Sequence, residues 1–105
     1  ITISKEIENA VEITRDISGV FQFLLNDYPL FYENLSEVII GEDKWTFYSD
    51  SKTQIFTRSE DLLTQLNILK NFEQTVYPKR QLGDYAYIDL RVEEQIIVKE
   101  KIRKG

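Results

Sequence analysis

Residues 85–99 read Tyr-Ala-Tyr-Ile-Asp-Leu-Arg-Val-Glu-Glu-Gln-Ile-Ile-Val-Lys. Within residues 85–92, tyrosines and charged side chains alternate with apolar ones, which is the two-residue period of a half-buried β-strand. The glutamates at 93–94 favour a tight turn, and the β-branched centre of residues 95–99 predicts a second strand paired with the first. The chain is therefore expected to finish with an antiparallel hairpin.

Three further strands are predicted upstream of this hairpin. Residues 38–40 are a β-branched run, residues 41–43 offer turn chemistry, and the aromatic residues within 45–48 indicate a second strand. The polar stretch 49–52 predicts another turn, after which residues 53–57 have strand character. These strands extend the expected antiparallel sheet to about five.

Two helices are predicted from apolar residues at helical spacing. The first covers residues 6–26 and ends before Pro29, because the residue that precedes a proline favours an extended backbone. The aromatic segment 30–35 is expected to close the end of the core. The second helix is expected to begin at Ser59, a good N-cap residue followed by two acidic residues, and to end at Pro78.

The expected fold class is α+β, an antiparallel sheet of about five strands with two helices packed on one face, in the order α-β-β-β-α-β-β. At 105 residues the chain suits one core, so residues 1–105 are expected to form a single domain. Methionine is absent even at position 1, and we expect the sequence to begin inside a longer protein. No apolar run approaches the roughly 20 residues that span a bilayer, so any membrane anchor is expected upstream.

Composition argues against several function classes. A formal net charge of −5 disfavours nucleic acid as a partner, since phosphate binding needs a clustered excess of Lys and Arg. The basic residues within 99–104 are expected to form a solvated tail, with contact to an acidic partner or an anionic membrane as the alternative. Cysteine and histidine are absent, which removes thiolate nucleophiles, imidazole bases and the usual zinc ligands. The glycines are far apart, so no cofactor, metal or nucleotide site is predicted.

Asp89 is the best candidate for a catalytic carboxylate, because it lies in an otherwise apolar strand where its pKa could be perturbed. The stronger alternative is that Asp89 pairs with Arg91, two positions along on the same strand face. Trp45 is expected in the core and becomes a contact candidate only if it faces solvent. We therefore predict no catalytic residue and no enzymatic activity.

The closing strand at 95–99 is expected to lie at an edge of the sheet, with one row of unpaired backbone N–H and C=O groups. Such an edge can bind an extended segment of another protein by β-augmentation. A proline at Ile97 is then expected to disrupt binding. The alternative is that charge protects the edge against pairing, through Glu93, Glu94, Lys99 and Glu100.

The segment Tyr85-Ala86-Tyr87-Ile88-Asp89-Leu90-Arg91, followed by a short turn and a β-branched strand, resembles the closing Tyr-(Ile/Val)-Asp-Leu-Arg hairpin of the FtsQ/DivIB family of bacterial cell-division proteins. The strand opening with Trp45, the acidic helix start at Glu60-Asp61 and the Tyr77-Pro78 pair are similar to the family's order and spacing, and the resemblance covers residues 7–99. It implies the extracytoplasmic β-domain of a single-pass membrane protein at the division septum. In that family the β-domain follows a membrane anchor and a POTRA domain.

The resemblance also implies a non-enzymatic divisome scaffold that recruits the FtsB/DivIC and FtsL coiled-coil proteins by strand addition to its last strand. Tyr87, Asp89 and Arg91 fall on the family's motif. Val92 stands where some members carry a contacting tyrosine, and Glu42 stands where some carry an arginine. Glu42 and Trp45 are secondary contact candidates, and partner binding is expected at Val92, Glu93, Glu94, Gln95, Ile96, Ile97, Val98 and Lys99.

Two other interpretations stay open. A helix-on-sheet cup of the cystatin or NTF2 type would bind a small molecule or act through Asp89 and Tyr87, and would place a deep pocket beside Asp89. An envelope assembly module related to POTRA would, like the division scaffold, lack enzymatic activity. Two observations distinguish these interpretations. An edge position of the closing strand favours docking of another protein, and a deep pocket beside Asp89 favours the helix-on-sheet cup.

Overall fold

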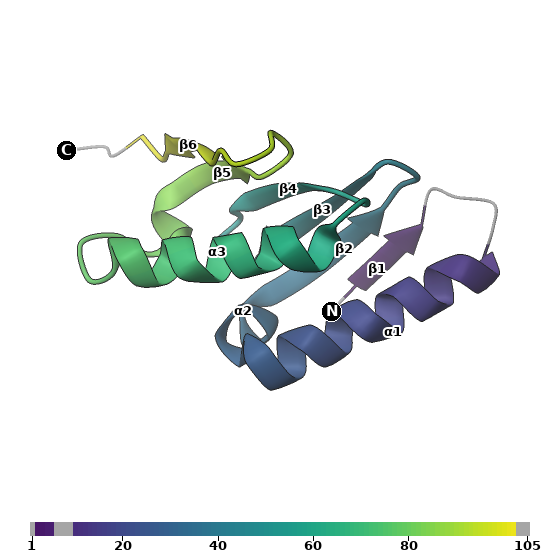
Figure 1. Cartoon of the computed structure of the whole chain (residues 1–105). Coiled ribbons are helices and arrows are strands. Elements are labelled where there is room, and N and C mark those ends of the chain that lie inside the picture. The colour runs from purple at the N-terminus through teal and green to yellow at the C-terminus, as the bar shows by residue number, and fades with distance from the viewer. Residues whose placement is uncertain (1, 6–9, 103–105) are drawn as a thin grey trace.

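The computed structural model describes residues 2–5 and 10–102 (Figure 1). The prediction of an α+β fold is confirmed. The helices are Ala10–Asp27 (α1), Pro29–Glu33 (α2) and Leu62–Val76 (α3), and a short 3-10 turn, η1, covers Leu82–Asp84. The strands are Thr2–Lys5 (β1), Leu35–Ile40 (β2), Lys44–Ser49 (β3), Gln54–Arg58 (β4), Tyr85–Asp89 (β5) and Ile97–Glu100 (β6).

Within residues 2–5 and 10–102, the sheet has six strands in the spatial order β1-β2-β3-β4-β5-β6, and it is mixed. The predicted antiparallel sheet of about five strands is therefore wrong in strand number and in direction. The strand that the prediction lacks is β1, which pairs parallel with β2, and β5 pairs parallel with β4. Helices connect both parallel pairs, because a helical crossover returns the chain to the starting end of the sheet before the next strand begins.

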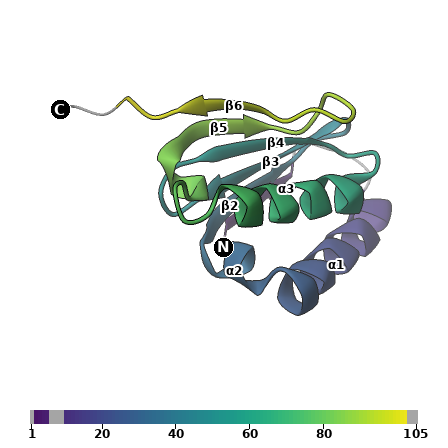
Figure 2. The same ribbon diagram turned by 60° about the vertical axis from the view of Figure 1, so that its left-hand side comes forward.

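The helices α1 and α3 cover one face of the sheet, and no helix of the described residues lies on the other face (Figures 1 and 2). The expectation that the helices share one face holds. A single core fills the space between the helices and the sheet. Side chains without exposed surface in this core are Leu24, Val38, Ile40, Phe47, Ile55, Leu66, Leu69 and Ile88.

The first predicted helix, residues 6–26, corresponds to α1, and its predicted residues 6–9 lie outside the described residues. The segment after it contains a short helix that the sequence analysis did not predict, α2, which begins at Pro29. Proline suits the first turn of a helix, where its missing N–H costs no hydrogen bond. Phe31 and Leu35 pack in the core as predicted, whereas Leu30 is exposed.

The predicted start of the second helix is wrong. The Ser59 hydroxyl does not cap α3 and instead donates a hydrogen bond to the carbonyl oxygen of Glu42, at 2.7 Å. Asp61 precedes the helix with a left-handed φ of 57°. The two acidic residues at 60–61 therefore lie before α3 and not in its first turn.

Gln65 organises the beginning of α3 from within the helix. Its side-chain oxygen accepts the backbone N–H of Arg58 at 2.7 Å. Its side-chain nitrogen donates to the carbonyl oxygens of Arg58 and Glu60, at 3.0 and 2.7 Å. Because Gln65 is buried, its side-chain amide needs these bonds in place of water, and they fix α3 to the end of β4.

The closing hairpin has shorter strands and a longer loop than the sequence indicates. β5 ends at Asp89 and β6 begins at Ile97, so the predicted strand bounds of 92 and 95 are wrong. The predicted tight turn at 93–94 is confirmed, because the Gln95 N–H donates to the Val92 carbonyl oxygen at 3.1 Å across it. Leu90 is buried, and its backbone N–H donates to the carbonyl oxygen of Phe56 on β4 at 2.9 Å. The core and β4 therefore hold residue 90 in place, and the chain turns only after it.

Candidate functional site

The last strand, β6, lies at one end of the sheet. Among the residues that the structure describes, β5 is its sole strand partner. Figure 2 shows β6 along the upper margin of the sheet, with α3 below the neighbouring strands. The closing strand thus has the edge position that the sequence analysis expects.

The backbone direction along β6 follows from one hydrogen bond at its end. The N–H of Lys101 donates to the carbonyl oxygen of Asp84 at 2.9 Å, so the backbone of residue 101 faces the β5 side. Successive residues of a strand direct their N–H and C=O groups to opposite edges. The other odd-numbered residues of β6 therefore face β5, and Val98 and Glu100 direct their backbone groups to the outer edge.

Side-chain contacts hold the C-terminal end of β6 in place. The Arg80 Nε lies 2.9 Å from a carboxylate oxygen of Glu100, an ion pair that raises the pKa of Arg80. The Lys101 Nζ donates to the carbonyl oxygen of Ser51 at 2.5 Å. The sequence analysis did not predict these contacts of Ser51, Arg80, Glu100 and Lys101. The paired residues are 20 and 50 positions apart, and such contacts appear only once the strand register is known.

The predicted partner-binding residues divide between β6 and the loop before it. Ile97, Val98 and Lys99 lie in β6 and are exposed. Ile96, just before β6, is only partly exposed, because its side chain packs against the core. The other predicted residues are exposed in the loop: Val92, Glu93, Glu94 and Gln95.

The charges expected to protect the edge do not lie along it as a continuous row. Glu93 and Glu94 precede β6, and the carboxylate of Glu100 is paired with Arg80. Lys99 is the remaining charged residue of the strand. The edge is therefore lightly charged, with two apolar residues, Ile97 and Val98, at its start.

Asp89 and Arg91 form a bidentate ion pair on the open face of the sheet. The Arg91 Nε and Nη2 donate to the two carboxylate oxygens at 2.9 and 2.8 Å, and the Arg91 backbone N–H donates to the first at 2.9 Å. The hydrogen bonds from the Arg91 side chain lower the pKa of Asp89. The Arg91 guanidinium also lies 5.1 Å from the ring centre of Phe56, beside Tyr87.

This geometry favours a structural role for Asp89. A carboxylate with a lowered pKa stays ionised at neutral pH and is a poor proton donor. Two open hollows in the described part of the chain have volumes of about 280 and 410 Å³, and neither is lined by Asp89 or Tyr87. The pocket that the cup interpretation expects beside Asp89 is not one of them.

Asp89→Asn is expected to lower the free energy of unfolding at neutral pH by about 1 kcal/mol, the upper range for a partly exposed ion pair. The pKa of Asp89 is lower in the folded protein than its ordinary value of 3.8, so its stabilising contribution is present above that value. The contribution is lost as the pH falls through the folded-state pKa. Urea unfolding measures the free energy of unfolding of both proteins at neutral pH and below about pH 4. This free energy should fall more on acidification for the wild type than for Asp89→Asn. An equal fall in the two proteins would contradict the ion-pair role.

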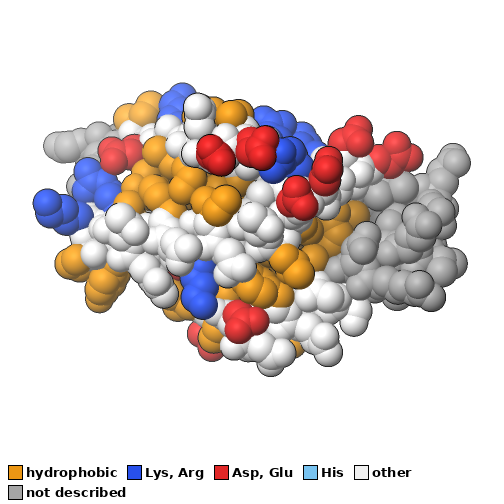
Figure 3. Space-filling model, viewed as in Figure 1, with side chains coloured by type: hydrophobic (Ala, Val, Ile, Leu, Met, Phe, Trp, Pro, Cys, Tyr) orange, Lys and Arg blue, Asp and Glu red, His pale blue; other side chains and the backbone are white. Residues whose placement is uncertain are grey.

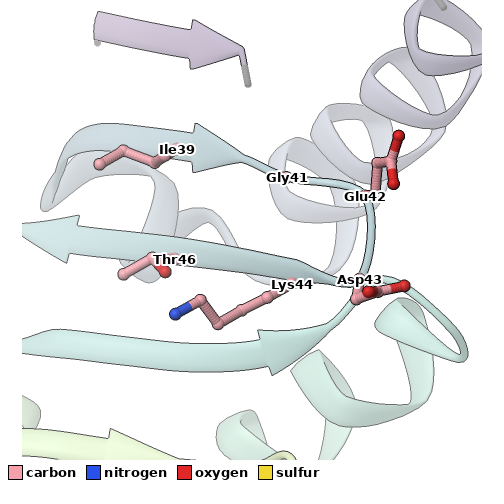
Figure 4. Close-up of a pocket in the computed structure, with 6 residues that line it drawn as sticks. All are labelled: Ile39, Gly41, Glu42, Asp43, Lys44 and Thr46. Carbon is pink, nitrogen blue, oxygen red and sulfur yellow. The ribbon is translucent and has the colours of Figure 1, made fainter. Parts of the chain in front are cut away.

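The two secondary contact candidates occupy different environments. Glu42 is exposed in the turn between β2 and β3, beside the smaller hollow, which is also lined by Ile39, Gly41, Asp43, Lys44 and Thr46 (Figure 4). Trp45 is 3% exposed, which confirms its expected place in the core, and the solvent-facing position that a contact role needs is not met. Two strands, β4 and β5, separate the Glu42 turn from β6. A partner on β6 would have to cross both to reach Glu42.

Within residues 2–5 and 10–102, no helix has the length and apolar character of a membrane span. The same residues contain no group of three or more Asp and Glu side chains that could hold a metal ion. Comparison with protein-family models and with curated proteins gave no match, so the functional assignment of this chain rests on its residues and their geometry.

Proposed function

We propose that this domain is a non-enzymatic scaffold that binds another protein by β-strand addition to β6. The observation that carries this proposal is the edge position of β6, with the backbone of Val98 and Glu100 directed outward. One N–H and one C=O from each residue offer up to four hydrogen bonds, each worth about 0.5–1.5 kcal/mol net. The contacts of Arg80 and Lys101 support the same role, because they hold the strand in a form that a partner can use without reordering it.

Backbone hydrogen bonds alone do not give stable docking. Association costs an estimated 4–15 kcal/mol in translational and rotational freedom, whereas four such bonds supply about 2–6 kcal/mol, which falls short of most of that range. Apolar side chains beside the edge provide the rest: Val92, Ile97 and Val98 are 43%, 41% and 38% exposed. Burying the exposed part of a large aliphatic side chain adds up to about 1.5 kcal/mol each.

The partner class follows from the resemblance to the FtsQ/DivIB β-domain. The Tyr87-to-Arg91 motif contains the end of β5, and the strand that follows it forms the open edge. The FtsB/DivIC and FtsL coiled-coil proteins are the partners we propose, with binding on the extracytoplasmic side of the membrane at the division septum. The membrane anchor that this location needs would lie upstream of the described domain.

A calorimetric titration tests this proposal. The folded domain is titrated with the extracytoplasmic segments of the FtsB/DivIC and FtsL proteins encoded by the same genome, each alone and as a co-expressed pair. Saturable binding by one of these is expected. Absence of binding to all of them, by a domain that unfolds cooperatively on heating, would contradict the proposed partners.

A further inference from the structure

The two side-chain faces of β6 meet different surroundings. Val98 pairs across the sheet with Ile88, which is fully buried under the helices, so the Val98 side chain lies on the helix-covered face. Ile97 and Lys99 alternate with Val98 and lie on the open face. An added strand would follow the same alternation, with each side chain on the face of its β6 neighbour.

On the helix-covered face, an apolar surface extends to the β6 edge. Val98 keeps much of its side chain exposed, because β6 lies beyond α3 (Figure 2). Phe72 of α3 packs on Tyr85, with ring centres 5.6 Å apart, and Tyr85 is the cross-strand neighbour of Glu100. Figure 3 shows apolar side chains gathered between α3 and the β5–β6 hairpin. A partner side chain opposite Val98 would bury apolar surface here.

On the open face, Lys99 carries a charge that the described side chains do not balance. The ion pairs within the described part of the chain join Arg80 to Glu100 and Arg91 to Asp89. The ammonium group of Lys99 is exposed and belongs to neither. An added strand would place one side chain directly beside it.

Charges elsewhere on the open face have both signs. Lys44 and Arg58 are cross-strand neighbours there. Glu37 lies on the same face, and Glu42 and Asp43 line a hollow with Lys44. The local charge that a strand added to β6 meets on this face is therefore that of Lys99.

We infer that β6 selects a partner strand with alternating chemistry, in which apolar side chains lie toward the helix-covered face and a carboxylate lies beside Lys99 on the open face. The inference rests on the proposed strand addition and specifies what that strand must carry. Opposite charges on neighbouring strands attract and like charges repel. Lys99 is therefore a specificity residue, because it favours an acidic strand and disfavours a basic one.

The test uses synthetic peptides of alternating sequence, Val at every second position and Glu, Gln or Lys at the positions between. Binding to the domain is followed by NMR shifts of the β6 amides at physiological ionic strength. The Glu peptide is expected to bind about fivefold more tightly than the Lys peptide, the upper range for an exposed ion pair. The difference should vanish in 1 M salt, where the screening length is only about 3 Å.

Charge-reversal variants separate Lys99 from the net charge of the domain. Lys99→Glu should make the Lys peptide bind more tightly than the Glu peptide. Lys99→Gln should remove the difference in affinity between the two peptides. The control is Lys70→Glu, which makes the same change in net charge on α3. Lys70 lies one helical turn from Glu73, whose carboxylate accepts a hydrogen bond from Tyr28 just after α1. Because residue 70 belongs to the helix layer, this variant should keep the wild-type preference for the Glu peptide.

Each outcome bears on the inference separately from the proposed function. Equal binding of all peptides through the β6 amides would overturn the charge selection and leave strand addition standing. Binding of no peptide would overturn the inference while the titration with division proteins still tests the proposed function. Self-association of the domain through the β6 amides, seen by sedimentation, would show that a second copy occupies the edge and would overturn both.

Discussion

Val98→Pro is expected to weaken partner binding by at least about tenfold while the domain stays folded. The N–H of Val98 faces the outer edge, so proline removes a donor that the partner uses and places its ring where the partner strand approaches. A lost hydrogen bond of up to about 1.5 kcal/mol corresponds to roughly a tenfold loss, and the ring adds a steric penalty. The bonds between β6 and β5 do not involve this N–H.

The matched variants are Val98→Ala and Ile97→Pro. Val98→Ala keeps the N–H and should weaken binding only through the lost apolar contact. Ile97→Pro, the change that the sequence suggests, removes an N–H that faces β5 and should damage the hairpin itself. Full-strength binding by a folded Val98→Pro domain in the calorimetric titration would contradict strand addition at β6.

Phe47→Ala is expected to lower the free energy of unfolding by about 4 kcal/mol, the largest stability effect we predict. Phe47 has no exposed surface and lies in the central strand β3. Its ring centre lies 5.7 Å from that of Phe31 and 6.2 Å from that of Trp45, so truncation opens a cavity where α2 meets the sheet. Domains of this size are stable by about 5–15 kcal/mol, and much of that margin would disappear.

Urea unfolding measures this loss, with Phe47→Leu and Leu25→Ala as comparisons. Phe47→Leu keeps most of the volume and should cost about 1.5 kcal/mol or less. Leu25 is 54% exposed on α1, and its truncation should change stability by about 0.5 kcal/mol or less. A Phe47→Ala domain as stable as the Leu25→Ala domain would show that Phe47 is not in the core.

The alternation of residues 85–92 was enough to predict β5 and its place before the closing strand. The Asp89–Arg91 pair was also accessible, because residues two apart on a strand share a face. β1 was not accessible, since residues 2–5 are too few to show a period. The parallel pairings that follow from the helical crossovers were missed for a related reason: alternation identifies a strand without giving its direction.

The candidate site could be located from the sequence but not described in detail. The apolar run at 95–99 indicated an edge strand, and β6 occupies that position. The turn at 93–94 was predicted, but the early end of β5 depended on Leu90, whose buried side chain and bond to Phe56 hold the chain against the core and β4. The identity of the outward residues depended on the Lys101 N–H to Asp84 bond, a contact that no local pattern encodes.

Amide hydrogen exchange of β6, measured by NMR with and without the partner segment, tests the central claim most directly. In the free domain, the Val98 and Glu100 amides should exchange rapidly, while those of Ile97 and Lys99 are protected by β5. On binding, the Val98 and Glu100 amides should become protected as well. Slow exchange at Val98 and Glu100 in the free domain, or no change there when the partner is bound, would contradict docking at this edge.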